Sequence, residues 1–470
     1  MSKVQIAFLG ATETVTGSRF LITSDSSKIL VDCGMFQGVK SDRLKNWEPF
    51  PVEPSTIDAV VLSHAHLDHS GFLPVLVRDG YKGPIFSTHY TKALTAVILR
   101  DSAHLQTEDA KYAAKKGYSK HKEPKALYGE EEVNKTLPLF EEVAYRTRTQ
   151  ITEDAFVTLY PSGHILGASF IELEVAGRKF LFTSDLGRNN HPILSDPDKA
   201  PIEGVDVVIT ESTYGDRLHE TPAQEFANEL NAAFARGGTV LIPAFAVDRT
   251  EVILMKLREL IETNQIPNVP IYVDSPMALT ALDYYREAVA GESKEIRTGI
   301  HEKFHDQDPF DTGQLFQMRT TEDSIKINGV QGNAIIISAS GMATGGRVVH
   351  HLQQLLPDPK NTIMLVGFQA AGTRGRALEQ GEKQLKMYGQ WIPVNAHIAK
   401  VESFSVHADA SELVDWLKPI PRPQQVFVVH GEPDGQRGLK ERLENQLNWY
   451  VTIPKGGQVF TINKENSCNE

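Results

Sequence analysis

The densest cluster of metal-binding side chains follows an apolar run in the first quarter of the chain. His64, His66, Asp68 and His69 come directly after residues 57–62, a pattern typical of a buried strand. We expect all four side chains on the loop where this strand leaves its sheet, facing one pocket. Neutral imidazole and carboxylate suit borderline divalent metals, so the cluster predicts two neighbouring ions, with His64 paired with His66 and Asp68 with His69. A solvated polar loop is the alternative, and four ligands at this density favour metal.

Other candidate ligands also lie at predicted strand ends. His164 follows a strand expected at 156–160, and Asp185 follows one expected at 179–183. Two such positions at successive strand ends indicate a pocket shared with the first cluster. Asp32 ends a further predicted strand, where its carboxylate could orient a ligand or a bound water, or serve only as a turn residue.

Three more candidate residues also lie at the ends of predicted strands. Glu211 follows the apolar strand 205–210, and His407 and His430 lie at or just beyond later predicted strands. A histidine that titrates near neutrality suits acid catalysis. For His407 taken alone, a buried structural histidine is an equal alternative.

The elements that must position these residues fall into two kinds. Short strands at hairpin spacing dominate the first 211 residues and return from residue 394. Between them, helices and apolar strands alternate, which predicts a separate doubly wound domain with a parallel sheet. We expect the polar stretches 104–139 and 291–332 to be surface excursions.

The composition is that of a folded chain with two or three domains. The chain has 470 residues, of which 41% are hydrophobic and 23% charged, and no apolar run reaches membrane-spanning length. The first residues lack a basic and apolar leader, so we expect a cytoplasmic protein. Cys33 and Cys468 are the two cysteines, which argues against a disulfide framework and leaves His and Asp as metal ligands.

The charge balance does not exclude a nucleic-acid partner. The net charge of −12 argues against one at first sight, but a polyanion responds to the field around its own cleft. Six lysines lie between residues 111 and 125, with Glu123 as the one acid among them. This basic run could form a funnel wall for a nucleic acid, and a solvated helical face is the alternative.

The order and intervals of the strand-end residues resemble the signature of the metallo-β-lactamase superfamily: Asp32, the run His64-Ala65-His66-Leu67-Asp68-His69, His164 and Asp185. Glu211, His407 and His430 resemble the additional motifs of its β-CASP branch, which contains nucleic-acid-processing nucleases. The stretches 404–409 and 429–432 are close to the type found in the mRNA 3′-end cleavage endonuclease.

This resemblance implies an α/β fold, a four-layer αββα sandwich into which a doubly wound, parallel-sheet β-CASP domain is inserted. It assigns residues 1–211 and 395–470 to the metallo-β-lactamase-like domain and residues 212–394 to the β-CASP domain. The last residues, 463–470, form a polar tail.

The resemblance also implies a role for each motif residue. One zinc ion would be held by His64, His66 and His164 and another by Asp68, His69 and His430, with Asp185 as the bridge and manganese as the alternative metal. A hydroxide held between the ions would attack phosphorus, with Asp32 orienting it. His407, poised by Glu211, would protonate the leaving oxygen.

Several residues are candidates for holding the phosphate backbone. The resemblance supports Ser405, two positions before His407. The weaker candidates are Ser340, Arg249, Arg347, Arg374 and Arg376. Arginine forks suit phosphate, but a surface or domain-interface ion pair is an equal alternative for each arginine.

These observations together predict a zinc-dependent ribonuclease that cleaves single-stranded RNA, with an endonucleolytic mode favoured. The alternatives within the same branch are a 5′ exonuclease and a DNA-acting nuclease. A small-ester or lactone hydrolase and a non-catalytic RNA-binding scaffold are less favoured. No membrane partner is expected, and both a monomer and a homodimer remain open.

Overall fold

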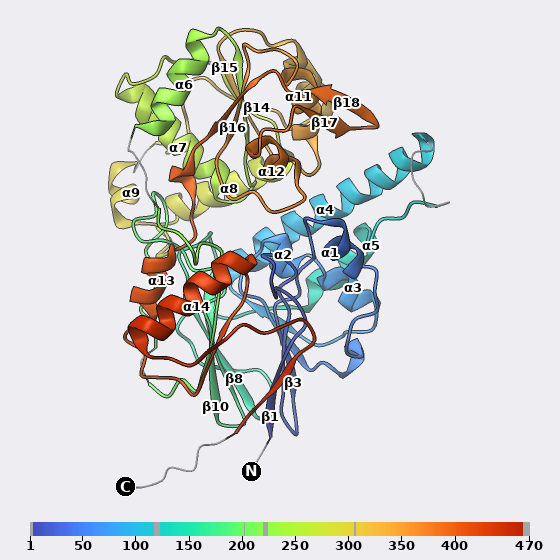
Figure 1. Ribbon diagram of the computed structural model, residues 1–470, viewed down its shortest axis with the longest axis vertical. Coiled ribbons are helices and arrows are strands. Elements are labelled where there is room, and N and C mark those ends of the chain that lie inside the picture. Colours follow the sequence, from blue (N-terminus) through green and yellow to red (C-terminus); the bar gives the residue numbers. More distant parts are fainter. Residues whose placement is uncertain (1–2, 117–122, 202, 220–223, 305–306, 464–470) are drawn as a thin grey trace.

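The computed structural model describes residues 3–463 except 117–122, 202, 220–223 and 305–306. Figure 1 shows two lobes, the lower holding both ends of the chain and the upper holding its middle. Lys120 and Lys122 of the basic run, and nearly all of the polar tail, lie outside the described residues. In the described part of the chain, no helix is both long and apolar enough to cross a membrane.

Two seven-stranded sheets face each other in the lower lobe. The first has the order β22 (Val459–Ile462), β1 (Val4–Phe8), β2 (Phe20–Thr23), β3 (Lys28–Val31), β4 (Ala59–Val61), β5 (Ile85–Ser87) and β6 (Phe140–Glu142). The second has the order β21 (Val451–Thr452), β20 (Gln425–Val428), β11 (Val207–Thr210), β10 (Arg178–Phe182), β9 (Ser169–Val175), β8 (Ala155–Pro161) and β7 (Thr149–Gln150).

Helices cover the outer face of each sheet. On the first sheet lie α3 (Leu73–Arg78), α4 (His89–Lys116) and α5 (Glu130–Thr136), which share one apolar cluster with β3, β4 and β5. On the second lie α13 (Ala410–Leu417) and α14 (Pro433–Leu447), packed against β10, β11 and β20. A separate core fills the space between the sheets. The lower lobe therefore has the predicted αββα layers.

The upper lobe contains a six-stranded sheet in which every pair is parallel. Its order is β14 (Leu315–Gln317), β13 (Ile271–Val273), β15 (Ala334–Ser338), β12 (Thr239–Pro243), β16 (Thr362–Leu365) and β19 (His397–Lys400). One face carries α6 (Glu225–Ala235), α7 (Arg249–Glu262) and α8 (Pro276–Ala290). The other carries α11 (Arg347–Leu355), α12 (Arg374–Glu379) and the hairpin of β17 (Gln384–Met387) and β18 (Gln390–Pro393). This is the predicted doubly wound arrangement.

Smaller elements complete the described chain. They are α1 (Lys40–Lys45), α2 (Leu67–Ser70), α9 (Thr298–Lys303), α10 (Thr321–Lys326) and the 3₁₀ turns η1 (Pro54–Thr56), η2 (Leu137–Leu139), η3 (Ile327–Gly329) and η4 (Glu402–Phe404).

The two stretches predicted to be surface excursions contain ordered elements, and most of their described residues are exposed or half-buried. The stretch 104–139 contains the second half of α4, all of α5 and the 3₁₀ turn η2. Ala113 is the one buried residue among residues 104–115, whereas Val133 of α5 packs into the core of the first sheet. The stretch 291–332 contains β14, whose pattern of burial is incomplete at the edge of the sheet. The strand β19, which follows residue 395, pairs with β16 of the upper sheet. The exact domain limits stay a prediction.

The two lobes share apolar packing. One cluster joins Leu94 and Ile98 of α4, and Ile165 of the β8–β9 loop, to Leu254 and Leu282 in the upper lobe. This shared packing holds the upper lobe against the edge of the sandwich where the candidate ligands lie.

Candidate metal centre

The topology brings the candidate ligands to one edge of the sandwich. In the first sheet β3 and β4 are parallel neighbours, and in the second β10, β11 and β20 are parallel neighbours. Parallel neighbours end at the same edge. Asp32 follows β3, and the cluster at residues 64–69 follows β4. Asp185, Glu211 and His430 follow β10, β11 and β20, and His164 lies in the β8–β9 loop.

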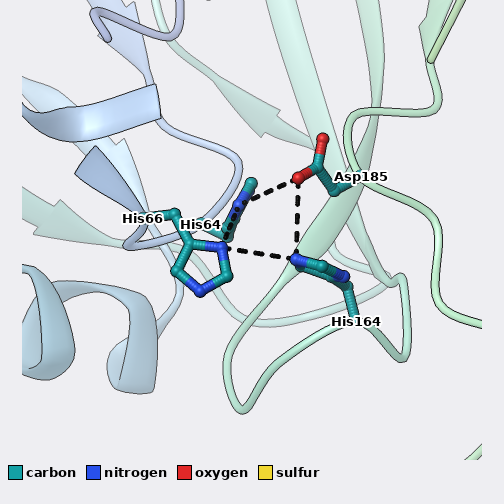
Figure 2. Close-up of side chains that lie close together, drawn as sticks. All are labelled: His64, His66, His164 and Asp185. Atoms are coloured by element: carbon teal, nitrogen blue, oxygen red, sulfur yellow. Dashed lines mark hydrogen bonds and ion pairs between the residues drawn. The ribbon is translucent and has the colours of Figure 1, made fainter. Parts of the chain in front are cut away.

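A first group of four side chains converges from three loops (Figure 2). His64 Nε2 lies 3.2 Å from His66 Nδ1. His164 Nε2 lies 3.4 Å from the same His66 nitrogen. The Oδ2 atom of Asp185 lies 3.5 Å from the Nε2 atoms of both His64 and His164. The four atoms thus enclose one common point.

A second group lies on the other side of the Asp185 carboxylate. His69 Nε2 lies 3.2 Å from His430 Nε2 and 3.3 Å from Asp185 Oδ1. Asp68 Oδ2 lies 3.6 Å from His430 Nε2. Asp185 therefore faces the first group with one oxygen and the second with the other, the arrangement expected of a bridge.

The spacing of these atoms fits metal ions. Ligands bound tetrahedrally to zinc at 2.0–2.1 Å lie about 3.4 Å apart, close to the separations observed in both groups. Burial lowers the pKa values of His64, His66 and His164 below the ordinary range, which keeps their rings neutral and able to donate a lone pair. The Oδ1 atom of Asp185 is buried without a hydrogen-bond partner. A divalent metal would satisfy this oxygen and the facing nitrogens together.

Asp32 holds one of these ligands in place. Its Oδ1 accepts a hydrogen bond from the Ser63 amide (2.8 Å), and its Oδ2 lies 2.7 Å from His69 Nδ1. Binding Nδ1 leaves Nε2 of His69 directed at the second group. Asp32 and His430 both have positive φ, at 57° and 46°, a strained backbone that is found at functional sites.

His407 and Glu211 form a pair beside the first group. His407 Nδ1 lies 3.2 Å from Glu211 Oε2, and its ring centroid lies 4.5 Å from that of His164. Burial lowers the pKa of His407, but the Glu211 carboxylate outweighs this and raises the pKa above its ordinary value. Glu211 is held in turn by the Leu186 amide, 2.6 Å from its Oε1. His407 can therefore carry a proton next to the first ligand group without leaving a buried charge unpaired.

A cavity of about 160 Å³ opens onto both groups from the junction of the lobes. Its polar floor includes His66, Asp68 and His407, and its walls include the rings of Phe245 and Phe368.

The structure separates the phosphate-binding candidates into two sets. Arg249 and Ser340 line the cavity. Arg249 is 5% exposed, its Nη1 donates to the Val366 carbonyl, and its Nε has no partner. Ser340 Oγ accepts a hydrogen bond from the Thr344 amide. Ser405 is buried beside Tyr214, which lines the cavity.

The other three arginines have partners elsewhere. Arg347 donates to Asp274 Oδ1 (2.7 Å), Arg374 to the Thr344 carbonyl (2.8 Å), and Arg376 to both Glu432 oxygens (3.2 Å). The ion pair between Arg376 and Glu432 joins the two lobes. It is the domain-interface ion pair that was the alternative to a phosphate contact in the sequence analysis. A phosphate contact for these three residues stays a prediction.

Sequence reasoning missed several residues of the site. Phe245, Phe368 and Tyr214 line the cavity, and His219 Nε2 lies 3.0 Å from the His407 carbonyl oxygen. Tyr214 could have been found, since it follows Glu211 by three positions at the same strand end. The phenylalanines carry no local signal that distinguishes them from core residues.

Comparison with known proteins agrees with this geometry. The metallo-β-lactamase superfamily domain matches residues 21–200, the Beta-Casp domain residues 250–378, and the Zn-dependent metallo-hydrolase RNA specificity domain residues 391–454. A crystal structure of a protein of unknown function from Enterococcus faecalis covers 98% of this chain with a TM-score of 0.53 at 13% identity.

Curated relatives cover nearly the whole chain. Ribonuclease TTHA0252 of Thermus thermophilus is 34% identical over 94% of this chain and 96% of its own length. An RNase J-like protein of Methanocaldococcus jannaschii is 33% identical over 98% and 100%. Transcription termination factor FttA of Methanosarcina mazei is 32% identical over 91% of this chain and 67% of its own.

The fold and the matched family domains define a metallo-β-lactamase-fold hydrolase. More particularly, the chain belongs to the β-CASP ribonuclease branch of that superfamily, as its motifs predicted.

Proposed function

We propose that the chain is a metal-dependent endoribonuclease that hydrolyses single-stranded RNA in the cavity between its lobes. The observation that carries the proposal is the pair of ligand groups that share Asp185, with His407 and Glu211 directly beside them. The RNA assignment is supported by relatives named as ribonucleases. Two zinc ions are the proposed metals, with manganese as the alternative, and the proposed location is the cytoplasm.

Each group of residues has a distinct task in this proposal. Metal ions, when bound, supply Lewis-acid chemistry that ionises water near neutral pH and neutralises charge on phosphoryl oxygens. His64, His66 and His164 form one ligand set and Asp68, His69 and His430 the other, with Asp185 between them. Asp32 keeps the His69 ring in its binding orientation through the 2.7 Å contact with Nδ1.

Other residues handle the proton and the substrate. The leaving sugar oxygen needs a proton, and the ring of His407 holds one with Glu211 on its Nδ1 side. The buried guanidinium of Arg249 has an unpaired Nε at the cavity wall and binds a phosphate oxygen. The rings of Phe245 and Phe368 exclude water and give flat surfaces for unpaired bases.

The test compares wild type with Asp185→Ala and His407→Ala on end-labelled single-stranded RNA, with metal content measured in parallel. We expect Asp185→Ala to lose metal and activity, and His407→Ala to keep its metal but lose activity by about 10²-fold or more. His397→Ala is the matched control, because this histidine lies on β19 with a half-exposed side chain. Equal cleavage by all four proteins would contradict the mechanism.

The same preparation distinguishes the alternatives. A circular single-stranded RNA has no end, so its linearisation supports the endonucleolytic mode, and cleavage of only the linear form supports the 5′ exonuclease. A DNA strand of the same sequence tests the preference for RNA. Turnover of a lactone but not of RNA would point to a small-ester hydrolase, and metal-loaded protein that binds RNA without turnover would point to a scaffold.

A further inference from the structure

The helix α1 lies on the side of the lower lobe that faces the upper lobe (Figure 1). Gln37, three residues before α1, lines the cavity. The next residues press against the upper lobe: a Cβ on Gly38 would lie 2.9 Å from the Ala371 carbonyl oxygen, and one on Gly372 would lie 2.8 Å from Val39 Cγ1. None of the six residues of α1 is buried. A strand that leaves the cavity past Gln37 therefore meets an exposed helix.

The charges on this helix are positive and largely uncompensated. Asp42, the acid of α1, is paired with Lys45 at 2.8 Å. Within the described part of the chain, no carboxylate forms an ion pair with Lys40 or Arg43, and both side chains are exposed. Lys40 and Arg43 therefore give the surface of α1 a positive charge that no ion pair among the described residues neutralises.

The upper lobe adds another positive charge next to them. Burial lowers the pKa of Arg374 and the Arg43 guanidinium lowers it further, whereas Tyr388 and the Asp109 carboxylate raise it. Arg374 is fixed by the carbonyls of Ala343 and Thr344, and Thr344 lines the cavity. Arg43 and Arg374 therefore repel each other across the seam, and a phosphate near both would reduce this repulsion in addition to the Asp109 carboxylate.

An exposed aromatic ring follows α1 directly. Trp47 is 57% exposed, and Leu44, one turn before it, is 47% exposed. The Trp47 amide donates to the Leu44 carbonyl (3.0 Å), which closes the last turn and keeps the two side chains on consecutive turns. Cations interleaved with an exposed indole are the combination that binds the phosphates and bases of a single strand.

We propose that α1 and Trp47 form an exit track that holds single-stranded RNA outside the cavity, with Lys40 and Arg43 on phosphates and Trp47 stacked on a base. The inference rests on the ribonuclease function proposed above. It adds a site of substrate contact that depends on the length of the RNA, because a short strand fills the cavity without reaching α1. An acidic protein segment is the competing occupant of such a surface.

The experiment measures RNA affinity by fluorescence anisotropy with metal-loaded full-length protein. The probes are 2′-O-methyl single strands of about 5 and about 20 nucleotides, over a range of salt concentrations. The test variant is Lys40→Glu with Arg43→Glu. The matched control is Lys294→Glu with Lys303→Glu, which makes the same change of net charge at two exposed lysines near α9, on the opposite side of the molecule from α1 in Figure 1.

We expect the test variant to bind the long strand about tenfold or more weakly, with a salt slope smaller by about 1.4 for two lost contacts. The short strand should change by less than twofold, and so should both strands with the control variant. Trp47→Ala should weaken binding of the long strand about fivefold or more at unchanged salt slope, since stacking carries no charge.

Three results would overturn the inference. They are an equal loss for both double variants, an equal loss for both strand lengths, and competition by poly-glutamate as effective as that by RNA. If wild type binds neither strand, the proposed ribonuclease function fails together with this inference. If wild type cleaves and binds RNA but the α1 variant is unchanged, only the exit track fails. Thermal unfolding of each variant confirms that the surface changes leave the fold intact.

Discussion

His69 and His430 place their Nε2 atoms 3.2 Å apart although 361 positions separate them in the chain. His69 comes from the loop after β4 and His430 from the end of β20, so the whole upper lobe is inserted between the two halves of one candidate metal site. The second ligand group can form only when the C-terminal segment has returned to the sandwich.

Replacing His430 should therefore remove one metal ion. We expect His430→Ala to lower the bound metal from about two to about one equivalent per chain, because the first group keeps all its ligands. Inductively coupled plasma mass spectrometry of the purified protein measures this ratio. His397→Ala is the control, and an unchanged metal content in His430→Ala would show that this histidine is no ligand.

Glu295 should make stability depend on pH. Its Oε2 accepts hydrogen bonds from the Gly167 amide (2.6 Å) and Tyr145 Oη (3.1 Å) across the lobe junction, and burial raises its pKa to about 7 from an ordinary 4.5. The folded state thus favours the protonated acid. Its contribution is fully present below pH 4.5 and is lost as pH rises through about 7, by about 3 kcal/mol.

Urea unfolding of Glu295→Gln at several pH values tests this. The amide keeps an acceptor but cannot ionise, so stability of the variant should fall less between pH 4.5 and 8 than that of wild type. The exposed Glu292, changed to Gln, is the matched control. Parallel pH profiles for Glu295→Gln and wild type would contradict the prediction.

Tyr285 links the upper lobe to the loop that carries His164. Its hydroxyl accepts a hydrogen bond from the Leu166 amide (3.0 Å) and donates one to Asp248 Oδ1 (2.8 Å). Tyr285→Phe leaves both groups buried with a partner lost, and we expect a loss of about 1–3 kcal/mol in the free energy of unfolding. Chemical denaturation measures it. Tyr450→Phe, at a side chain that is 68% exposed, should change stability by less than about 0.5 kcal/mol.

Arg249 and Arg376 should differ in their effect on RNA binding. Arg249 faces the cavity without a carboxylate partner, so Arg249→Met should weaken binding about tenfold or more and reduce the salt slope by about 0.7. Arg376 is occupied by Glu432, and Arg376→Met should leave the slope unchanged. Because that ion pair is partly exposed, its loss should cost less than about 1 kcal/mol of stability. Equal changes in slope for both variants would mean that Arg376 also contacts phosphate.

The convergence of the candidate metal ligands could be predicted from the sequence because their signal is local. Each lies where an apolar strand ends, and the residues from His64 to His69 are close neighbours in the chain. The alternation of helices and strands in the middle of the chain likewise predicted the parallel sheet, since a helical crossover is needed between parallel strands. The strand β14 was not predicted, because an edge strand buries too few of its side chains to give an apolar pattern in the sequence.

Pairings between distant residues could not be predicted in this way. The sequence around these residues gives no sign that Arg376 pairs with Glu432 or that Tyr285 bonds to Leu166. Each contact depends on how the lobes pack. The same holds for the contact between Tyr112 of α4 and Tyr388 of the upper lobe, whose ring centroids lie 5.7 Å apart.

The sequence by itself determined which side chains are available for chemistry and that they lie at strand ends. Only the tertiary structure decided that Asp185 faces both ligand groups and that Asp32 binds His69 Nδ1. It also decided which arginines remain free for a substrate. The physical reason is that donor type and strand periodicity are properties of short segments, whereas separations of about 3.4 Å between ligand atoms require several strands and both lobes to be packed in register.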